Sequence, residues 1–160
     1  MDIYKDLDIY EDRIIIRQIS QNKLLCATYD ENLSLNSQSF YNLKIKQSSI
    51  KEFNHFYLLG IINSILLSYY FIKSFGSYKR LFPRILIEKI KNLPIKVPKT
   101  EEEINLAKNV IKNVKMLLNI KENNKKLKNE LEFKIDSYIF KLYGISQKDQ
   151  EYIIEFIKQL

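Results

Sequence analysis

Residues that build metal sites and disulfides are almost missing from this sequence. Its 160 residues include one cysteine, Cys26, one histidine, His55, and no tryptophan. A single cysteine excludes a disulfide within the chain, and one cysteine with one histidine cannot complete a zinc site. Cys26 lies in an apolar run and is predicted to be a small buried side chain. No metal site is predicted, and the expected localisation is a reducing cytoplasm.

Glycine and proline are also scarce, with three of each. The glycines are Gly60, Gly76 and Gly144, which are too far apart to form a phosphate-binding loop. Because so few glycines and prolines force few turns, the composition favours long helices over an all-β sandwich. No nucleophile and base are spaced for joint action, so no catalytic residue and no enzymatic activity of this chain alone are predicted.

The residues that are abundant indicate a folded, basic protein. Hydrophobic residues make up 46% and charged residues 28%, which excludes a disordered chain. Lysine and arginine number 26 against 19 acidic residues, giving a net charge of +7. Such a surface attracts nucleic acid phosphates or anionic membranes. An AT-rich genome would produce the same excess of lysine, so charge alone does not identify a partner.

The first third of the chain predicts three strands. Residues 13–18 and 23–29 are rich in β-branched and apolar residues, and the polar connection 20–22 between them suits a hairpin. Residues 30–38 are polar and are predicted to form a loop. Residues 40–46 alternate apolar and polar side chains, as a half-buried strand does.

Residues 52–74 are predicted to form one core helix. Residues 56–72 carry no charge, which is near the lower length limit of about 17 residues for a membrane-spanning helix. The polar residues Asn63, Ser64 and Ser68 lie within this stretch and favour a buried helix of a folded domain instead. Gly60 and Ser64 would let a neighbouring backbone approach closely.

Residues 85–87 are predicted to be a short strand, followed by a helical turn over 88–92. Residues 93–98 are predicted to be extended, because proline restricts both its own backbone and that of the residue before it.

The last third of the chain predicts helices. Thr100 and Glu103 form a capping-box pattern, and apolar residues follow it at spacings of three and four. A second periodic run spans 127–142, with Gly144 as a C-terminal cap, and Ser146 begins a last helix. These helices are expected to pack together, with coiled-coil dimerisation as the alternative.

The predicted fold class is α/β, more specifically α+β: a small mixed sheet packed on a buried helix, followed by a helical tail. Two domains are predicted, an α/β domain at 1–98 and a helical extension at 99–160.

Four segments in a fixed order carry a resemblance to a known family. They are the strands 13–18 and 25–30, the helix start at 57–64, the Leu-Pro-Ile segment within 90–95, and residues 135–145 followed by Glu151. Together they resemble the TaqI-like C-terminal specificity domain of type IIG restriction–modification enzymes and adenine-specific DNA methyltransferases. The Leu-Pro-Ile segment before a long helix is also similar to the specificity subunits of type I restriction systems.

The resemblance implies recognition of specific double-stranded DNA as part of a larger enzyme. Parent enzymes carry an Asn-Pro-Pro-Tyr motif in a fold that binds S-adenosylmethionine, and often a Mg²⁺-dependent nuclease; neither part is found in this sequence. The resemblance therefore implies a C-terminal fragment or separate subunit. Its expected partners are duplex DNA and the methyltransferase and nuclease domains, and it needs no cofactor of its own.

Such a domain must neutralise phosphates and present side chains to base edges. Arginine and lysine suit guanine, and asparagine and glutamine suit adenine. The predicted phosphate contacts are basic residues around the 75–84 connection, namely Lys73, Lys79, Arg80, Arg84, Lys89 and Lys91. The predicted base-reading residues are polar loop residues, namely Gln18, Gln21, Asn22, Lys23, Asn36 and Gln38.

Three other functions remain open from sequence. The helical tail suits a protein–protein interaction module without DNA binding, residues 56–72 suit a membrane-associated protein, and an unrecognised active site would make the chain an enzyme. No membrane is expected as a partner under the preferred interpretation.

Overall fold

The fold is a three-stranded sheet packed on helices. The computed structural model describes residues 11–19, 24–45, 49–75, 85–121 and 123–160. The strands β1 (Arg13–Arg17), β2 (Ala27–Asp30) and β3 (Phe40–Leu43) form a sheet of order β2-β1-β3, in which both strand pairs are antiparallel. The predicted α+β class is confirmed, and so are the strands predicted over 13–18, 23–29 and 40–46, although each is shorter than expected.

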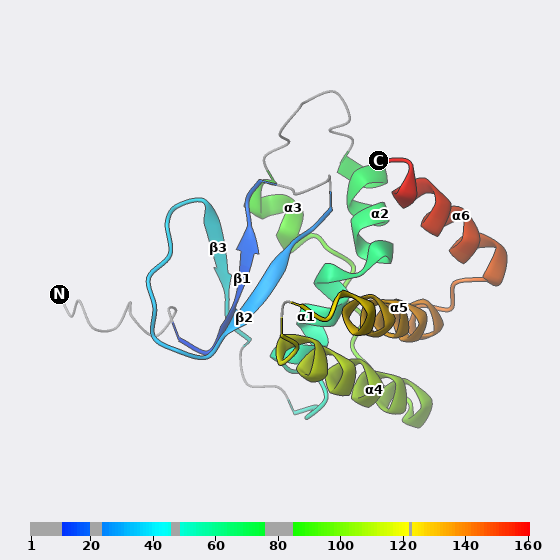
Figure 1. The fold of residues 1–160 in the computed structure, drawn as a ribbon, viewed down its shortest axis with the longest axis horizontal. Coiled ribbons are helices and arrows are strands. Elements are labelled where there is room, and N and C mark those ends of the chain that lie inside the picture. The colour runs from blue at the N-terminus through cyan, green and yellow to red at the C-terminus, as the bar shows by residue number, and fades with distance from the viewer. Residues whose placement is uncertain (1–10, 20–23, 46–48, 76–84, 122) are drawn as a thin grey trace.

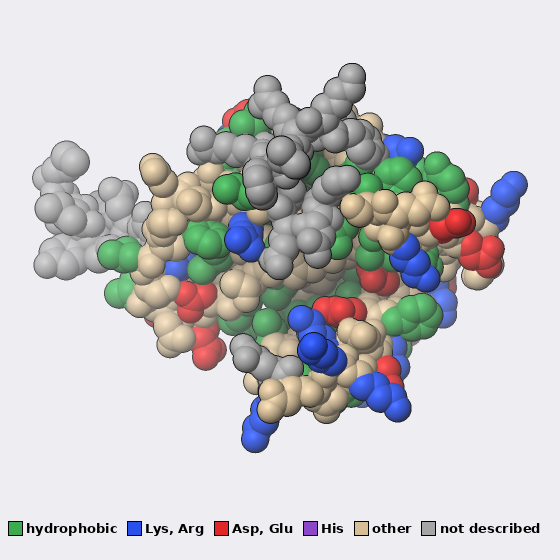
Figure 2. All heavy atoms as spheres, turned by 45° about the horizontal axis from the view of Figure 1, so that its top comes forward, with side chains coloured by type: hydrophobic (Ala, Val, Ile, Leu, Met, Phe, Trp, Pro, Cys, Tyr) green, Lys and Arg blue, Asp and Glu red, His purple; other side chains and the backbone are tan. Residues whose placement is uncertain are grey.

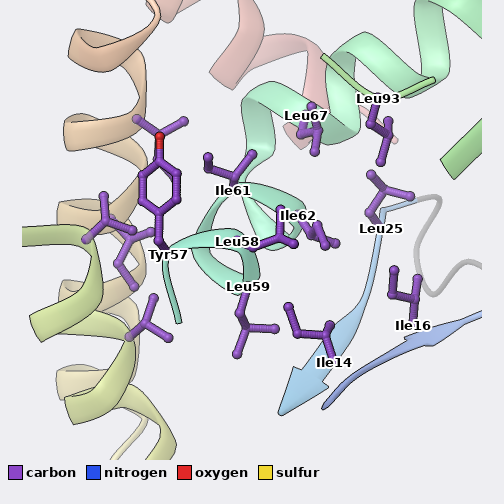
Figure 3. Packing of buried hydrophobic residues seen from close by; sticks show 14 of the residues in the cluster. Ile14, Ile16, Leu25, Tyr57, Leu58, Leu59, Ile61, Ile62, Leu67 and Leu93 are labelled. Atoms are coloured by element: carbon purple, nitrogen blue, oxygen red, sulfur yellow. The ribbon is translucent and has the colours of Figure 1, made fainter. Parts of the chain in front are cut away.

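The central strand supplies the sheet's share of the core. Ile14 is paired with Tyr29 of β2 and Leu43 of β3, and Ile14 and Ile16 are fully buried. Both isoleucines point from β1 toward the helix that lies across this face of the sheet (Figure 3). Their alternation with Ile15 places one face of the strand in the core, as the period of two requires.

The predicted core helix is in fact two helices, so the prediction of a single helix over 52–74 is wrong. Helix α1 (His55–Asn63) and helix α2 (Ile65–Phe75) meet at Ser64 with a bend of 59°. The Ser64 hydroxyl donates to the carbonyl of Ile61 at 2.7 Å and accepts from the amide of Leu67 at 3.1 Å. One side chain thus ends the first helix and starts the second, which is how serine competes with helical hydrogen bonds.

No single helix among the described residues is long and apolar enough to cross a membrane. The bent pair α1–α2 passes that test only when its two helices are taken together. Most of the apolar side chains of α1 are buried inside the fold.

The predicted strand at 85–87 is not formed. Ile85 is buried and its amide donates to the carbonyl of Gln18 at 2.7 Å, but Leu86 and Ile87 are exposed and Ile87 already begins helix α3 (Ile87–Lys91). Three apolar residues in a row do not distinguish a strand from a helix start. The helical turn predicted over 88–92 is confirmed.

The segment after α3 is held by two tyrosines. The hydroxyl of Tyr57 donates to the carbonyl of Lys96 at 2.8 Å, and the hydroxyl of Tyr143 donates to the carbonyl of Pro94 at 2.7 Å. Lys96 also forms an ion pair with Glu103 at 2.8 Å. This irregular segment is therefore tied to helices on both sides of it.

The tail has the predicted helices: α4 (Glu101–Leu118), α5 (Lys125–Leu142) and α6 (Gln147–Lys158). The capping box of Thr100 and Glu103 is present. Gly144 has a φ of 67° after α5, and the amide of Ile145 donates to the carbonyl of Phe140, as in a Schellman motif. Ser146 accepts from the amide of Asp149 and caps α6.

The core is continuous from the sheet to the tail. Buried residues of α4 and α5, among them Val110, Val114 and Ile139, belong to the same cluster as Ile14 of β1. Helices α4 and α5 lie side by side, α4 packs against α1, and α6 packs on α2 (Figure 1). The ring centroids of Tyr69 on α2 and Phe156 on α6 are 5.3 Å apart. The division at 98/99 stays a prediction about independent folding.

Gly60 allows α4 to approach α1 closely. A Cβ atom at this position would lie 2.6 Å from Cγ1 of Val110 and 3.1 Å from Cγ2 of Val114. The close approach that the sequence predicted is therefore present for Gly60.

We expect Gly60→Ala to lower the free energy of unfolding by about 1–3 kcal/mol because the added methyl overpacks the α1–α4 contact. This should outweigh the better helix propensity of alanine, about 1 kcal/mol. Chemical denaturation measures the effect. Adding Val110→Ala makes room for the methyl, so the double variant should lose less stability than the two single losses combined. A Gly60→Ala protein as stable as wild type would contradict the tight contact.

Candidate nucleic-acid interface

Three connections of the chain are anchored at one end of the sheet. The side-chain amide of Gln18, just after β1, donates to the carbonyl of Gln38 at 2.7 Å, and the amide of Gln18 donates to the carbonyl of Ser39 at 3.0 Å. The carbonyl of Gln18 accepts from Ile85, whose own carbonyl accepts from the hydroxyl of Tyr41 at 3.0 Å. The connections β1–β2, β2–β3 and α2–α3 therefore all have an anchor here; we call this region the sheet end.

The arrangement is visible in Figure 1, where the end of β1, the start of β2, the last turn of α2 and α3 lie at the same end of the molecule. The sequence predicted base-reading residues on the first two connections and phosphate-binding residues on or near the third. The described anchors place the adjoining ends of these three predicted segments on a common side.

The described base-reading candidates differ in how far their side chains are exposed and in the hydrogen bonds that they already make within the chain. Gln18 is only 6% exposed and its amide is used inside the chain, so it shapes the adjoining loop and is not offered to solvent. Asn36 is partly exposed; it accepts from Arg13 at 3.4 Å and donates to the carbonyl of Ser37 at 3.2 Å. Gln38 is exposed. The remaining three candidates, Gln21, Asn22 and Lys23, lie outside the described residues.

The described phosphate-contact candidates already have partners within the chain. Lys73 is exposed, and its ammonium lies 4.4 Å from the ring centroid of Phe156. Lys89 lies over the ring of Phe75 at 5.5 Å, and Lys91 pairs with Glu88 at 3.1 Å. The other three candidates, Lys79, Arg80 and Arg84, lie outside the described residues.

Arg13 is a structural residue of the site that the sequence did not single out. It is fully buried, donates to the carbonyl of Ser34 at 2.7 Å and to Oδ1 of Asn42 at 3.1 Å, and pairs with Asp30 at 3.6 Å. A hydrogen bond from Ser34 lowers the pKa of Asp30, with Arg13 adding to the effect. Arg13 thus holds the β2–β3 connection against the sheet. A cation at the start of an isoleucine run was the only sequence signal for it.

The outer edge of β2 is occupied by helix side chains. The side-chain amide of Asn63 accepts from the amide of Ala27 at 2.8 Å and donates to its carbonyl at 2.9 Å, while the amide of Leu25 donates to the hydroxyl of Ser68. These bonds fix the strand to both sides of the α1–α2 break.

A cleft of about 660 Å³ lies between the start of β2, the α1–α2 break and the α4–α5 turn. Its floor is mainly aliphatic, and its polar lining residues include Lys121, Lys125, Lys128 and Asp136. Figure 2 shows lysine and acidic side chains at the border of a hollow with apolar side chains inside it. Leu24, the residue after the predicted base-reading connection, lines the same cleft.

Asp136 connects α5 to the break between α1 and α2. Its Oδ1 accepts from the amide of Ile65, the first residue of α2, at 3.0 Å. The pKa of the Asp136 carboxyl is raised to about 7, mainly by burial; the Ile65 hydrogen bond opposes this rise and the charge of Glu132 adds to it.

His55 has a structural position at the start of α1. Its Nε2 accepts from the amide of Ile45 at 3.3 Å, and its Nδ1 lies 3.4 Å from a carboxylate oxygen of Asp12. Burial lowers the pKa of the His55 imidazole. Among the described residues, no group of three histidine, cysteine or acidic side chains is placed to hold a metal ion.

Comparison with known proteins identifies the family. Residues 1–95 match the model of the TaqI-like C-terminal specificity domain. This match covers more than half of the chain, and the chain belongs to that family of restriction-system specificity domains. The predicted resemblance is confirmed.

A putative type II restriction enzyme and methyltransferase from Methanocaldococcus jannaschii is 32% identical over 137 residues. The alignment covers 82% of this chain and 11% of that protein, so the chain spans about a tenth of the relative's length. The aligned stretch is longer than the family match, so the similarity continues into the helical tail.

We expect Asp136→Asn to stabilise the protein at neutral pH. The folded-state pKa of Asp136 is raised from 3.8 to about 7. The unfolded chain therefore ionises first as the pH rises, and stability is lost between about pH 4 and pH 7, by at most about 4 kcal/mol. Asparagine keeps the oxygen that accepts from Ile65 but does not ionise, so the advantage of the variant should grow across this interval.

Urea denaturation of both proteins between pH 4 and pH 8 measures the difference. Glu130→Gln, which removes an exposed carboxylate from the same helix, is the control and should shift stability far less. If the free energy of unfolding changed with pH in the same way for wild type and Asp136→Asn, the result would contradict a buried carboxyl that resists ionisation.

Proposed function

We propose that the chain recognises a specific double-stranded DNA sequence for a restriction–modification enzyme. The observation that supports this most directly is the anchoring of three candidate DNA-binding connections at the sheet end. The anchoring residues all lie within the part of the chain that matches the specificity-domain family; they include Gln18, Gln38 and Ile85.

In this proposal the sheet is a rigid platform and its connections contact the duplex. Basic side chains set the position by binding phosphates, and polar side chains discriminate base pairs by their edges. Gln38 and Asn36 are the described candidates for base contacts, together with Gln21, Asn22 and Lys23. Gln18 contributes by shaping the connection, since its amide is engaged with Gln38.

We further propose that the chain is the C-terminal part of a type IIG enzyme that methylates adenine, working in the cytoplasm. S-adenosylmethionine and Mg²⁺ would be held by other parts of that enzyme. Because a methyltransferase must rotate its target base out of the duplex, this domain would fix the register at which the correct adenine meets the active site. The similarity to a putative type II restriction enzyme and methyltransferase supports this assignment.

A protein-interaction module is the second candidate function. Phe133 on α5 is 69% exposed and Met116 on α4 is 45% exposed, and large exposed apolar side chains favour contact with another protein. A partner that binds regardless of salt, with no affinity of the chain for DNA, would support this alternative.

We expect the chain to bind duplex DNA with an affinity that falls steeply as salt rises, because released counterions drive phosphate binding. Replacing Lys79 and Arg80 by glutamate should abolish the binding. Fluorescence anisotropy with a short labelled duplex measures both effects. Lys148→Glu with Lys158→Glu changes the charge equally on the exposed surface of α6 and is the matched control. Equal affinity of the Lys79/Arg80 variant and wild type would refute the assignment of this segment.

Gln38→Ala should relax sequence preference rather than weaken all binding. Removing a base contact costs about 1–3 kcal/mol of discrimination at one base pair, whereas binding to phosphates is unaffected. Selection from a randomised duplex pool, compared between wild type and variant, measures the change. Ser37→Ala in the same exposed loop is the control. An unchanged preference at every position would remove Gln38 from the base-reading set.

A further inference from the structure

Four lysines are gathered at the turn between α4 and α5. Lys121, Lys125, Lys126 and Lys128 are all exposed. In the part of the chain that the structure describes, their one ion pair joins Lys128 to Glu132 at 3.9 Å, and both side chains are about half exposed. Such a pair contributes little, so ion pairs among the described residues compensate little of this cluster's charge, although Glu132 and Asp136 line the same cleft.

The contrast with the predicted phosphate contacts is clear. Lys73 and Lys89 lie over aromatic rings of the chain, and Lys91 pairs with Glu88. The lysine cluster therefore has more positive charge available for an external anion than the described residues that the sequence pointed to.

The position of the cluster at the start of α5 also does not favour the stability of that helix. Helix α5 begins at Lys125, and its first turn contains no acidic residue. The start of a helix carries a partial positive charge, so lysines there repel it and acidic residues would stabilise it. Bound phosphates would offset both this repulsion and the repulsion among the lysines.

The position of the cluster connects it to the proposed DNA surface. Lys121, Lys125 and Lys128 line the same cleft as Leu24, which directly follows the base-reading candidates Gln21, Asn22 and Lys23. Ala27, the first residue of β2, lines this cleft as well, and Figure 2 shows lysine or arginine side chains at the border of the hollow. A strand of DNA lying beside Leu24 would pass these lysines.

We infer that the α4–α5 turn is a second DNA-binding surface that contacts the phosphodiester backbone through Lys121, Lys125 and Lys128. This inference rests on the proposed function and extends it into the helical tail, beyond residues 1–95 that match the family. The contacts are independent of sequence, because phosphates are the same at every base pair. The tail thereby adds affinity, while the sheet end supplies specificity.

The test compares the 160-residue chain with a triple variant, Lys121→Gln, Lys125→Gln and Lys128→Gln. The matched control, Lys141→Gln, Lys148→Gln and Lys158→Gln, removes the same charge from exposed positions at the other end of α5 and on α6. Anisotropy titrations use a labelled duplex of mixed sequence at several salt concentrations, and circular dichroism verifies that each variant is folded.

The triple variant of Lys121, Lys125 and Lys128, called the cleft variant, should bind the duplex with an affinity at least about tenfold lower at physiological salt. Its slope of log affinity against log salt should fall by about 2–3, because each phosphate that the protein no longer neutralises reduces the slope by about 0.9. Any preference among duplex sequences should be unchanged. The control variant should show a markedly smaller effect on affinity.

Three results would overturn the inference, and they are distinguishable. If wild type binds no duplex, the proposed function and this inference fall together. If wild type binds and the cleft variant keeps its affinity and salt slope, the proposed function stands and the lysine cluster is not a DNA contact. Weaker binding to an acidic protein segment without any change in DNA binding would likewise assign the cluster to a protein partner and overturn the inference.

Discussion

The break at Ser64 is the constraint on which the rest of this structure depends. The Ser64 hydroxyl closes α1 and opens α2, and its two neighbours are each tied to a distant part of the chain. Asn63 binds both backbone groups of Ala27, and Ile65 donates to Asp136 of α5. A straight helix could not present these groups to a strand edge and to α5 at once. The bend thus sets how sheet, core helix and tail meet.

In the proposed function, the same geometry separates two tasks on one small domain. The sheet end joins three connections through short hydrogen bonds at Gln18 and Ile85, where rigid anchoring suits the reading of base edges. The cleft next to it is bordered by long, flexible lysines, which suit a partner whose charge matters more than its exact shape. Because Gly60 allows α4 to contact α1 closely, the helical tail is held beside the sheet.

Local signals made much of this fold predictable. The Thr100 capping box, the Gly144 cap and the Ser146 cap each need only a few neighbouring residues, and all three are present. The Ser64 break was not predictable, because the tertiary partners of its neighbours, Ala27 and Asp136, are far away in sequence and a serine alone fits a continuous helix. The burial of Gln18 depends on the carbonyl of Gln38, which lies 20 residues further along the chain.

The pairing of Asn63 with Ala27 has a consequence for assembly. A strand at the rim of a sheet is a template for an incoming strand, and an occupied rim cannot accept one. The Ala27 groups are taken by Asn63, and the amide of Leu25 is taken by Ser68, so the start of β2 cannot accept an added strand. A strand from another part of a larger protein would therefore meet an edge that is already occupied at the start of β2, and the other outer strand of the sheet is β3.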